Sequence, residues 1–543
     1  MLLNSAAYRS LASRSVLLTC SPASIPYIIN TFVRIGGPVN RTIYWPLQSK
    51  MQSVGTLLIE TSSIESLHYT MLRISSFHPI YCTTNSNHSK NVLKLPIFRV
   101  HSDPSIWPVE NIAKYLSYQY PSELYTQANF SVRPSVPSSK EMTNILMSCQ
   151  SFDDQVSTLH KLTHLSEQDI LARFILSDSI EEILRYIFPG TKVSIFGSVT
   201  NGLGSVNSDV DLVIELPLNF SDLKHFTANK QTNDISKLCQ TNILSLNPNC
   251  LRNKFLSFMQ VMLSRLDPLG FRHSRIYTGR VPILHFDHIH ILKVGLDISW
   301  LVSPTLMNNN ELSHCGTRMT EILFLLTLCI PEIQKSVTLL KYLARKLYLT
   351  RNGPSPGFTN FKLITLFINF LQVSNYAPSF IRLQAFLDNS FTLDDASTFS
   401  IHSHFFDLNQ FPSMEHLLNN FLAYVCSIKP CDVIIDLRNG CLTPRLKSNH
   451  DINENSVVSH KKNFILCPDP MYPQHNIWSG INEDQWLDFV QICRTLQNLL
   501  KVKCDQEKKN NWGILAITDF NDFAKSTSVY DSSRHQFVDS LQS

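Results

Sequence analysis

The sequence predicts an α+β fold, in which a mixed β-sheet with helices is followed by a mainly helical domain. Two apolar, strand-like runs flank a polar loop in 193-VSIFGSVTNGLGSVNSDVDLVIEL-216. A later stretch, 281–300, is rich in β-forming residues, whereas apolar residues recur at helical spacing over about 142–188 and 319–373. At 543 residues the chain is too long for one core, so we expect several domains.

The N-terminal segment has the composition of a mitochondrial presequence. Residues 1–59 lack Asp and Glu, are rich in Ser, Thr and Leu, and carry the basic residues Arg9, Arg14, Arg34, Arg41 and Lys50. We therefore predict that residues 1–50 are a presequence or a disordered extension, and that the protein resides in the mitochondrial matrix. A secretory signal fits less well because arginines interrupt the apolar stretch.

The order of the predicted elements divides the rest of the chain. A strand, a helix and a strand within 55–100 predict a small α+β module, and Pro189-Gly190 ends a helical run before the first strand of the main sheet. No apolar run reaches the length of a membrane span. The predicted parts are a module at 53–130, a catalytic domain with its N-terminal helices at 142–310, a helical domain at 311–520 and a polar tail at 521–543.

The overall composition is that of a globular protein, with 43% hydrophobic and 17% charged residues. The net charge of +4 is compatible with a nucleic-acid partner but does not require one. Thirteen cysteines occur without a CxxC pair. Their spacing argues against a zinc ribbon or a disulfide scaffold and favours reduced thiols.

The second strand predicted within residues 193–216 carries two aspartates one residue apart. Residues i and i+2 of a strand share a face, so Asp209 and Asp211 project together. Two such carboxylates repel each other unless a cation lies between them, and Mg²⁺ binds carboxylates together with phosphate oxygens and water. Gly197 allows a close approach of the backbone to an anion, and Ser198 can donate its hydroxyl. The pattern therefore predicts a site for a metal-bound triphosphate.

A two-metal site needs a third carboxylate, and Asp297 on another predicted strand is the natural candidate. It would bind the second Mg²⁺ or Mn²⁺ and help to accept a proton. Asp287 is a competitor, but it lies among histidines in 285-HFDHIH-290 and is interpreted as a turn or edge residue. A lone DxD is more often a surface or turn feature, so the prediction depends on the whole combination.

This combination resembles the nucleotidyltransferases of the DNA-polymerase-β-like superfamily. The motif alone would also fit enzymes of the kanamycin nucleotidyltransferase or oligoadenylate synthetase type. Downstream segments narrow the resemblance to poly(A) polymerases and terminal uridylyltransferases, and most of all to the mitochondrial poly(A) polymerases, over roughly 53–520. These segments are 338-TLLKYLARK-346, 357-GFTNFKLITLFINFLQ-372, 433-VIIDLRNG-440, 467-CPDPMYPQHNI-477 and 511-NWGIL-515.

The resemblance implies a polymerase-β-like palm, a helical poly(A)-polymerase-associated domain and a small RRM-like module, through which the chain would form a homodimer. It implies the addition of AMP from ATP to the 3′-hydroxyl of RNA. Addition of UMP from UTP is the alternative. A catalytically inactive RNA-binding scaffold is a remote alternative, which the three intact aspartates argue against. The module lacks an evident pair of stacking aromatics, so RNA binding by it is not assured.

The resemblance also assigns roles to residues. Gly197 and Ser198 would hold the β- and γ-phosphates, and Asp209, Asp211 and Asp297 would hold two metal ions. Lys341 and Arg345, one helical turn apart, match positions that contact the triphosphate, with a solvated helix face as the alternative. Residues 333–387 contain seven basic and no acidic residues, which suits a polyanion.

Four more residues match positions near the base. Asn360 and Phe361 match a pair whose aromatic ring stacks on the incoming base, although Phe361 would also suit a helix core. Asp469 matches an acidic position near the base edge. His475 departs from the apolar residue of mitochondrial poly(A) polymerases and is associated with uridine-preferring relatives, because imidazole can donate to a uracil carbonyl. A surface position is the more common outcome for a single histidine.

Overall fold

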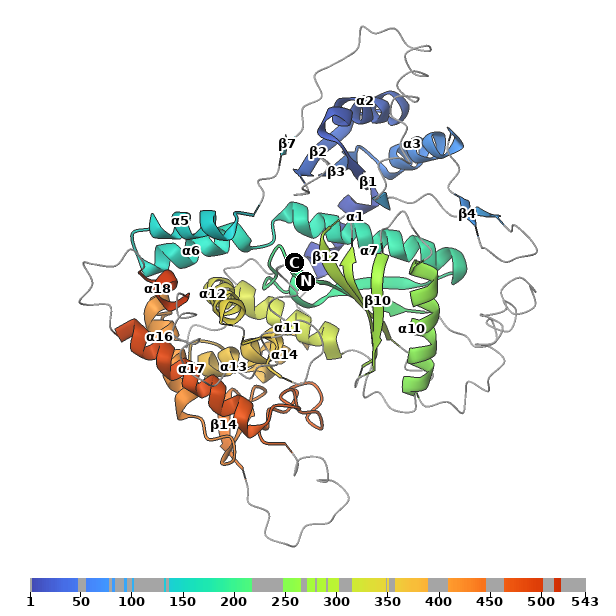
Figure 1. Cartoon of the computed structure of the whole chain (residues 1–543). Coiled ribbons are helices and arrows are strands. Elements are labelled where there is room, and N and C mark those ends of the chain that lie inside the picture. Colours follow the sequence, from blue (N-terminus) through green and yellow to red (C-terminus); the bar gives the residue numbers. More distant parts are fainter. Residues whose placement is uncertain are drawn as a thin grey trace. The chain divides into compact units, whose positions relative to one another are not determined.

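The computed structural model of the chain contains two compact units (Figure 1). Unit 1 comprises residues 1–135 and 165–321, and unit 2 comprises residues 136–164 and 322–543. The structure describes residues 2–46, 55–77, 81–83, 92–94, 100–101, 131–132, 136–216, 248–264, 271–278, 281–289, 292–301, 315–347, 349–350, 357–388, 409–445, 463–501 and 512–518.

The central sheet of unit 1 has five strands in the order β10-β11-β12-β9-β8. Strands β9 and β12 pair in parallel, and the other neighbours pair antiparallel. The sheet is therefore mixed, and the predicted α+β fold is confirmed. The strands are β8 (Lys192–Phe196), β9 (Val210–Glu215), β10 (Phe271–Tyr277), β11 (Ile283–Ile289) and β12 (Val294–Leu301).

Alternation along these strands separates an apolar face from a polar one. Val210, Leu212 and Ile214 of β9 lie in a buried core that also contains the alternate residues of β12 and side chains of α7 (Glu167–Ile187) and α10 (Pro248–Ser264). Asp211 and Asp297 occupy the intervening positions and are only half-buried. The period of two thus buries one face against helices and leaves the aspartates on the other.

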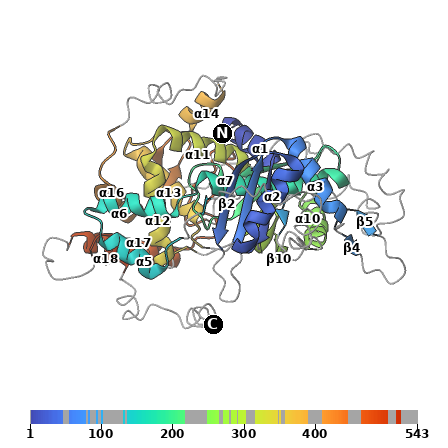
Figure 2. The same cartoon turned by 90° about the horizontal axis from the view of Figure 1, so that it is seen from above.

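The N-terminal part of unit 1 forms a second five-stranded sheet in the order β6-β1-β3-β2-β7. The strands β1, β2, β3 and β6 with helices α2 and α3 follow the β-α-β-β-α-β order of a ferredoxin-like sandwich. Helices α2 and α3 lie side by side (Figure 2). The elements are α1 (Leu2–Ser13), β1 (Ser15–Cys20), α2 (Ile25–Gly36), β2 (Val39–Pro46), β3 (Gly55–Thr61), α3 (Ile64–Phe77), β6 (Val100–His101) and β7 (Ser131–Val132), with a separate β4 (Tyr81–Thr83) and β5 (Val92–Lys94) pair.

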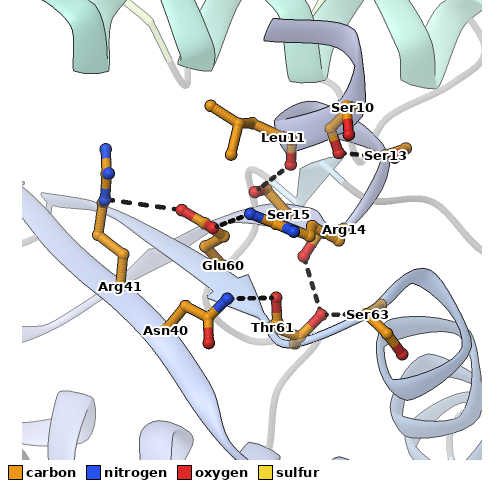
Figure 3. A network of polar contacts seen from close by, with 10 residues as sticks. All are labelled: Ser10, Leu11, Ser13, Arg14, Ser15, Asn40, Arg41, Glu60, Thr61 and Ser63. Carbon is orange, nitrogen blue, oxygen red and sulfur yellow. Dashed lines mark hydrogen bonds and ion pairs between the residues drawn. The ribbon is translucent and has the colours of Figure 1, made fainter. Parts of the chain in front are cut away.

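The structure contradicts a disordered extension at residues 1–50 for the part that it describes, whereas the presequence stays a prediction. Strand β1 is buried throughout and pairs with β3 from Ser15 to Cys20. Three of the four arginines that suggest a presequence have acidic partners further along the chain. Arg14 and Arg41 both contact buried Glu60, at 2.8 and 3.6 Å (Figure 3), and Arg9 approaches Glu181 at 3.9 Å. These three arginines are thus paired with acidic residues that lie outside residues 1–59.

One predicted boundary needs correction. The small module begins before residue 53, because β1 and β2 belong to its sheet. The helices α5 (Ser139–Met147) and α6 (Phe152–Thr163), which precede the central sheet in sequence, pack in unit 2. The tail at 521–543 lies outside the described residues.

Both faces of the module's sheet are covered. Val16, Leu18 and Ile59 pack with α2 and α3, whereas Leu17, Ile43 and Leu58 belong to the core cluster that contains α7. In an RRM, one sheet face is a platform on which bases stack. In this chain, the described residues of β1, β2 and β3 offer no such open platform.

Unit 2 is mainly helical, as predicted. Its strands β13 and β14 form a hairpin around the predicted Asn439-Gly440 turn, and the side chain of Asn482 caps α17 by accepting from the Gln485 N–H. Its elements are α5, α6, most of α11 (Cys315–Cys329), α12 (Glu332–Lys346), α13 (Asn360–Val373), α14 (Phe380–Asp388), α16 (Met414–Ser427), β13 (Val433–Asp436), β14 (Cys441–Pro444), α17 (Glu483–Lys501) and α18 (Ile514–Thr518).

None of the helices in the described ranges is by itself long and apolar enough to cross a membrane, although two consecutive helices, Gly316–Cys329 and Glu332–Lys346, pass that test as a bent pair.

Candidate active site

Two of the three predicted metal-binding aspartates lie on neighbouring strands, and the third, Asp209, directly precedes one of these strands. Asp211 of β9 is the direct partner of Asp297 on β12 in the parallel pairing. Asp209, just before β9, lies opposite Gly295 and close enough to Asp297 for their charges to interact. The structure therefore brings together on one face three carboxylates that are up to 88 residues apart in the sequence.

Each of these carboxylates leans towards a different neighbour. The Asp211 Oδ2 lies against Gly197, and the Asp209 Oδ1 lies against Gly295, whose backbone N–H donates to Asp209. The Asp297 Oδ1 is 2.5 Å from Nδ1 of His285 on β11. The carboxylates are thus spread across the sheet rather than converged on one point.

The electrostatic environment of Asp209 favours its neutral form. Part of the residue is exposed, yet the protein around its carboxyl group removes much of its hydration, and Asp297 adds a like charge. Desolvation, followed by this repulsion, raises the pKa of Asp209. A cation between the two carboxylates would relieve the repulsion.

Residues Gly197 and Ser198 form a tight turn directly after β8. Gly197 has a φ of +71° and begins a three-residue 3-10 helix, Gly197–Val199. An added Cβ on Gly197 would lie 2.3 Å from Asp211 Oδ2, so any other residue there would displace the Asp211 carboxylate. The Gly197 N–H donates to the buried hydroxyl of Thr320 at 2.9 Å. Ser198 is half-buried beside this turn.

A buried arginine with no predicted role holds the loop before Asp209. Arg173 of α7 donates to the carbonyl oxygens of Val206 and Ser208 at 3.0 and 3.2 Å. Its charge also lowers the pKa of Asp209, although less than desolvation raises it. Its sequence signal is one arginine among apolar residues in 170-ILARFIL-176.

A second residue without a predicted role is His285 of β11, which is the direct pairing partner of Asp297 on β12. Its Nδ1 faces Asp297 and its Nε2 is 3.2 Å from Asp287 Oδ1, while Arg275 of β10 approaches Asp287 at 3.6 Å. The hydrogen bond to Asp297 raises the pKa of His285. Asp287, interpreted from sequence as a turn or edge residue, instead lies within strand β11.

The donor set suits a hard divalent cation, because Mg²⁺ and Mn²⁺ prefer carboxylate oxygens. In the part of the chain that the structure describes, no three acidic, histidine or cysteine side chains already form a metal-binding group. This follows from the spread of the carboxylates. Asp211 and Asp297 are direct partners on adjacent strands, so their side chains start from the same face of the sheet.

The other predicted site residues lie in unit 2. Lys341 and Arg345 are on α12, where Arg345 is exposed and Lys341 is half-buried. Both face away from the buried stripe of this helix, which includes Leu340, Leu343 and Ala344. This arrangement is compatible with a phosphate contact and also with a solvated helix face.

The start of α13 presents Asn360 and Phe361 to solvent. Phe361 is 41% exposed, whereas every residue from Lys362 to Gln372 is buried. The helix-core interpretation of Phe361 is therefore wrong, because its ring is not part of that core. A large exposed aromatic side chain at a helix start is a suitable surface for stacking.

A buried lysine joins α13 to the segment that carries Asp469 and His475. Lys362 Nζ donates to the carbonyl oxygens of Gly357 and Ser479 at 2.9 and 3.0 Å, and burial lowers the pKa of Lys362. Trp478 Nε1 donates to Thr365 Oγ1 at 3.2 Å. The first turns of α13 and the end of this segment are thus fixed to each other.

Asp469 and His475 belong to one tight loop. The Asp469 N–H donates to the His475 carbonyl, and the His475 N–H donates to the Tyr472 carbonyl, both at 2.8 Å. The buried Asp469 Oδ1 accepts from the Met471 and Tyr472 N–H groups. Asp469 therefore shapes the loop, and the ring of His475 is half-buried, 6.3 Å from that of Tyr472.

Comparison with known proteins supports the interpretation of the central sheet. Residues 152–313 match the family model described as the central palm domain of mitochondrial-like poly(A) RNA polymerase. This range contains the Gly197–Ser198 turn and all three aspartates. The resemblance inferred from sequence is confirmed for this region.

Relatives of the palm extend the similarity along the chain. The mouse mitochondrial poly(A) RNA polymerase is 24% identical over 408 residues, which is 70% of this chain and 62% of the mouse protein. The human protein of that name is 26% identical over 236 residues, which is 43% of this chain and 38% of the human one. The chain thus matches less than two thirds of these relatives' lengths.

A solved structure, mtPAP in complex with ATPγS, shares the fold. It aligns with a TM-score of 0.67 and 18% identity, covering 95% of this chain and 99% of that one. At this identity the similarity shows the fold alone.

Proposed function

We propose that this protein is a template-independent nucleotidyltransferase that adds AMP from ATP to the 3′-hydroxyl of RNA. The carrying observation is the register that places Asp211 beside Asp297, with Asp209 on the same face and the Gly197–Ser198 turn against Asp211. Its relatives are named as poly(A) RNA polymerases, which supports this choice of reaction.

Each palm residue would have a separate role in the reaction. Asp209, Asp211 and Asp297 would hold two Mg²⁺ or Mn²⁺ ions, which would supply Lewis-acid stabilisation of the phosphoryl charge. Asp297 would accept the proton of the RNA 3′-hydroxyl as its oxygen attacks the α-phosphorus. The bond from the α-phosphorus to the bridging oxygen breaks, and pyrophosphate leaves. Ser198 and the Gly197 turn would orient the β- and γ-phosphates.

The helical unit would bind the nucleotide. Lys341 and Arg345 would neutralise phosphate charge, since neither belongs to the buried stripe of α12. The exposed ring of Phe361 would stack on the base, with Asn360 beside it. The loop that Asp469 shapes would present His475 towards the base edge.

A terminal uridylyltransferase is the second candidate, and His475 is the observation that favours it. A ring N–H can donate to a uracil carbonyl, whereas the amino group of adenine is itself a donor. The loop fixes the backbone of His475 through two 2.8 Å hydrogen bonds. The alternative predicts greater use of UTP than of ATP.

The cellular setting is also part of the proposal. The names of the relatives support a mitochondrial location, and this support does not depend on residues 1–50 being a presequence. The proposed macromolecular partner is the 3′ end of RNA. Homodimer formation through the N-terminal module remains a prediction, to be tested by the mass of the chain in solution.

Extension of a labelled RNA tests the function. The full chain is incubated with 5′-labelled RNA, Mg²⁺ or Mn²⁺, and one nucleoside triphosphate at a time. We expect a ladder of products with ATP, shorter products with UTP, and none when the RNA ends in a 3′-deoxynucleotide. Absence of extension with all four nucleotides would overturn the proposal, and preference for UTP would select the second candidate.

A further inference from the structure

A continuous row of side chains crosses the palm sheet at the level of the aspartates. Successive pairings link Phe196 to Asp211, Asp211 to Asp297, Asp297 to His285, and His285 to Arg275. Residues directly opposite each other in a sheet share a face. His285 is therefore the neighbour of the proposed metal-binding aspartates on the side away from the Gly197 turn.

The ring of His285 is held at both nitrogens. Its Nδ1 lies 2.5 Å from Asp297 Oδ1, and its Nε2 lies 3.2 Å from Asp287 Oδ1. Only 13% of its side chain is exposed, and the ring of Tyr277 lies 5.7 Å away, between centroids. Rotation of the imidazole would break both contacts, so the ring has one favoured orientation.

His285 contacts the Oδ1 atom of Asp297 and not its Oδ2 atom. A hydrogen bond to one carboxylate oxygen sets the plane of the carboxylate and therefore the direction of its second oxygen. Outer hydrogen bonds of this kind commonly orient metal-binding side chains, and their loss weakens metal affinity by about 10- to 100-fold. Direct binding of the cation by His285 is disfavoured, because both ring nitrogens already face carboxylates and Mg²⁺ prefers oxygen.

We propose that His285 is a positioning residue that orients Asp297 for the catalytic cation, while Asp287 fixes the far side of its ring. This inference rests on the proposed function, because it assigns a role relative to the same metal site. Arg275, which is exposed, ends this series of contacts by approaching Asp287 at 3.6 Å. The sequence 285-HFD-287 therefore serves the site through its two outer residues, which share a face of β11.

Two substitutions of His285 separate its two contacts. The amide nitrogen of Asn lies near the position of Nδ1, so His285→Asn retains a donor towards Asp297. The longer side chain of Gln places its nitrogen near Nε2, so His285→Gln retains a donor towards Asp287 alone. His285→Leu removes both donors, and thermal unfolding of each variant checks that the fold is kept.

Electron paramagnetic resonance can measure Mn²⁺ binding to the full chain in the absence of RNA and nucleotide. This measurement does not depend on activity. We expect His285→Asn to bind Mn²⁺ within about threefold of the unchanged chain, whereas His285→Gln and His285→Leu should bind it about 10- to 100-fold more weakly. The Mg²⁺ concentration for half-maximal RNA extension should likewise be higher for His285→Gln and His285→Leu than for His285→Asn.

Equal Mn²⁺ affinity in the unchanged chain and His285→Leu would overturn the inference, and so would equal losses in the Asn and Gln variants. Asp297→Asn distinguishes this failure from failure of the proposed function. If Asp297→Asn loses Mn²⁺ affinity and the His285 variants do not, the metal site stands and the positioning role is wrong. If Asp297→Asn also binds normally, the metal site itself is wrong, and both proposals fall.

Discussion

Replacement of Gly197 by alanine should inactivate the site while leaving the chain folded. The residue has a φ of +71°, where an alanine costs about 1–2 kcal/mol of folding free energy. The new Cβ would lie 2.3 Å from Asp211 Oδ2, whereas ordinary contact begins at 3.4 Å. The carboxylate must therefore move by roughly 1 Å, and a misplacement of that size can lower a catalytic rate by about 100-fold.

Gly37→Ala is the matched control for this substitution. Gly37 also has a positive φ, +92°, but an added Cβ there has nothing within 4 Å. Gly37→Ala should lose at least as much unfolding free energy in urea titrations, because a φ of +92° with a ψ of −156° is a conformation that almost only glycine adopts. Only Gly197→Ala should lose about 100-fold in the rate of RNA extension at saturating nucleotide. Similar rates for the two variants would show that contact between Gly197 and Asp211 does not matter for catalysis.

Three further predictions concern unit 2. Burial lowers the pKa of His160 from 6.5 to about 4, so the unfolded chain binds a proton at this residue more readily than the folded chain does. The free energy of unfolding should therefore fall as the pH drops from about 6.5 to about 4. His160→Asn should flatten this pH dependence in urea titrations, and an unchanged slope would contradict the role given to His160. Phe361→Leu should raise the KM for ATP about tenfold through lost stacking, with stability changed by less than about 0.5 kcal/mol, whereas Val373→Ala, at an exposed position on the same helix, should leave KM unchanged. His475→Leu should lower the ratio of UTP to ATP use in single-nucleotide extension, and a constant ratio would remove His475 from base selection.

The palm could be predicted from sequence because its signal is local. The strands around 193–216 alternate, the turn needs glycine, and the two aspartates share a face by their spacing alone. Asp297 was also found from its strand context, and its pairing with Asp211 follows once the two strands are parallel neighbours. Local periodicity therefore carries most of the site in unit 1.

The N-terminal segment could not be predicted in the same way, because its stabilising contacts are long-range. The acid-free composition of residues 1–59 was interpreted without Glu60 and Glu181, the partners of Arg14, Arg41 and Arg9. Glu60 lies one residue beyond the segment that was counted. Composition within a window cannot reveal charges that are paired across the fold.

The role of His285 was hidden for a related reason. The cluster 285-HFDHIH-290 has no regular pattern, and a β-bulge between Phe286 and Ile289 interrupts its pairing. Only the register with β12 places His285 opposite Asp297. In the same way, α5 and α6 precede the palm in sequence but pack in unit 2, which sequence order alone does not indicate.

The central claim is that the palm carboxylates catalyse nucleotide transfer to RNA, and the most direct measurement compares Asp211→Asn with Glu215→Gln. Both changes remove one carboxylate from the same face of β9, but only Asp211 pairs with Asp297. We predict that the rate of RNA extension falls at least about 100-fold in Asp211→Asn, as expected when charge stabilisation worth several kcal/mol is lost, and changes less than about twofold in Glu215→Gln. Unchanged extension by Asp211→Asn would contradict the account.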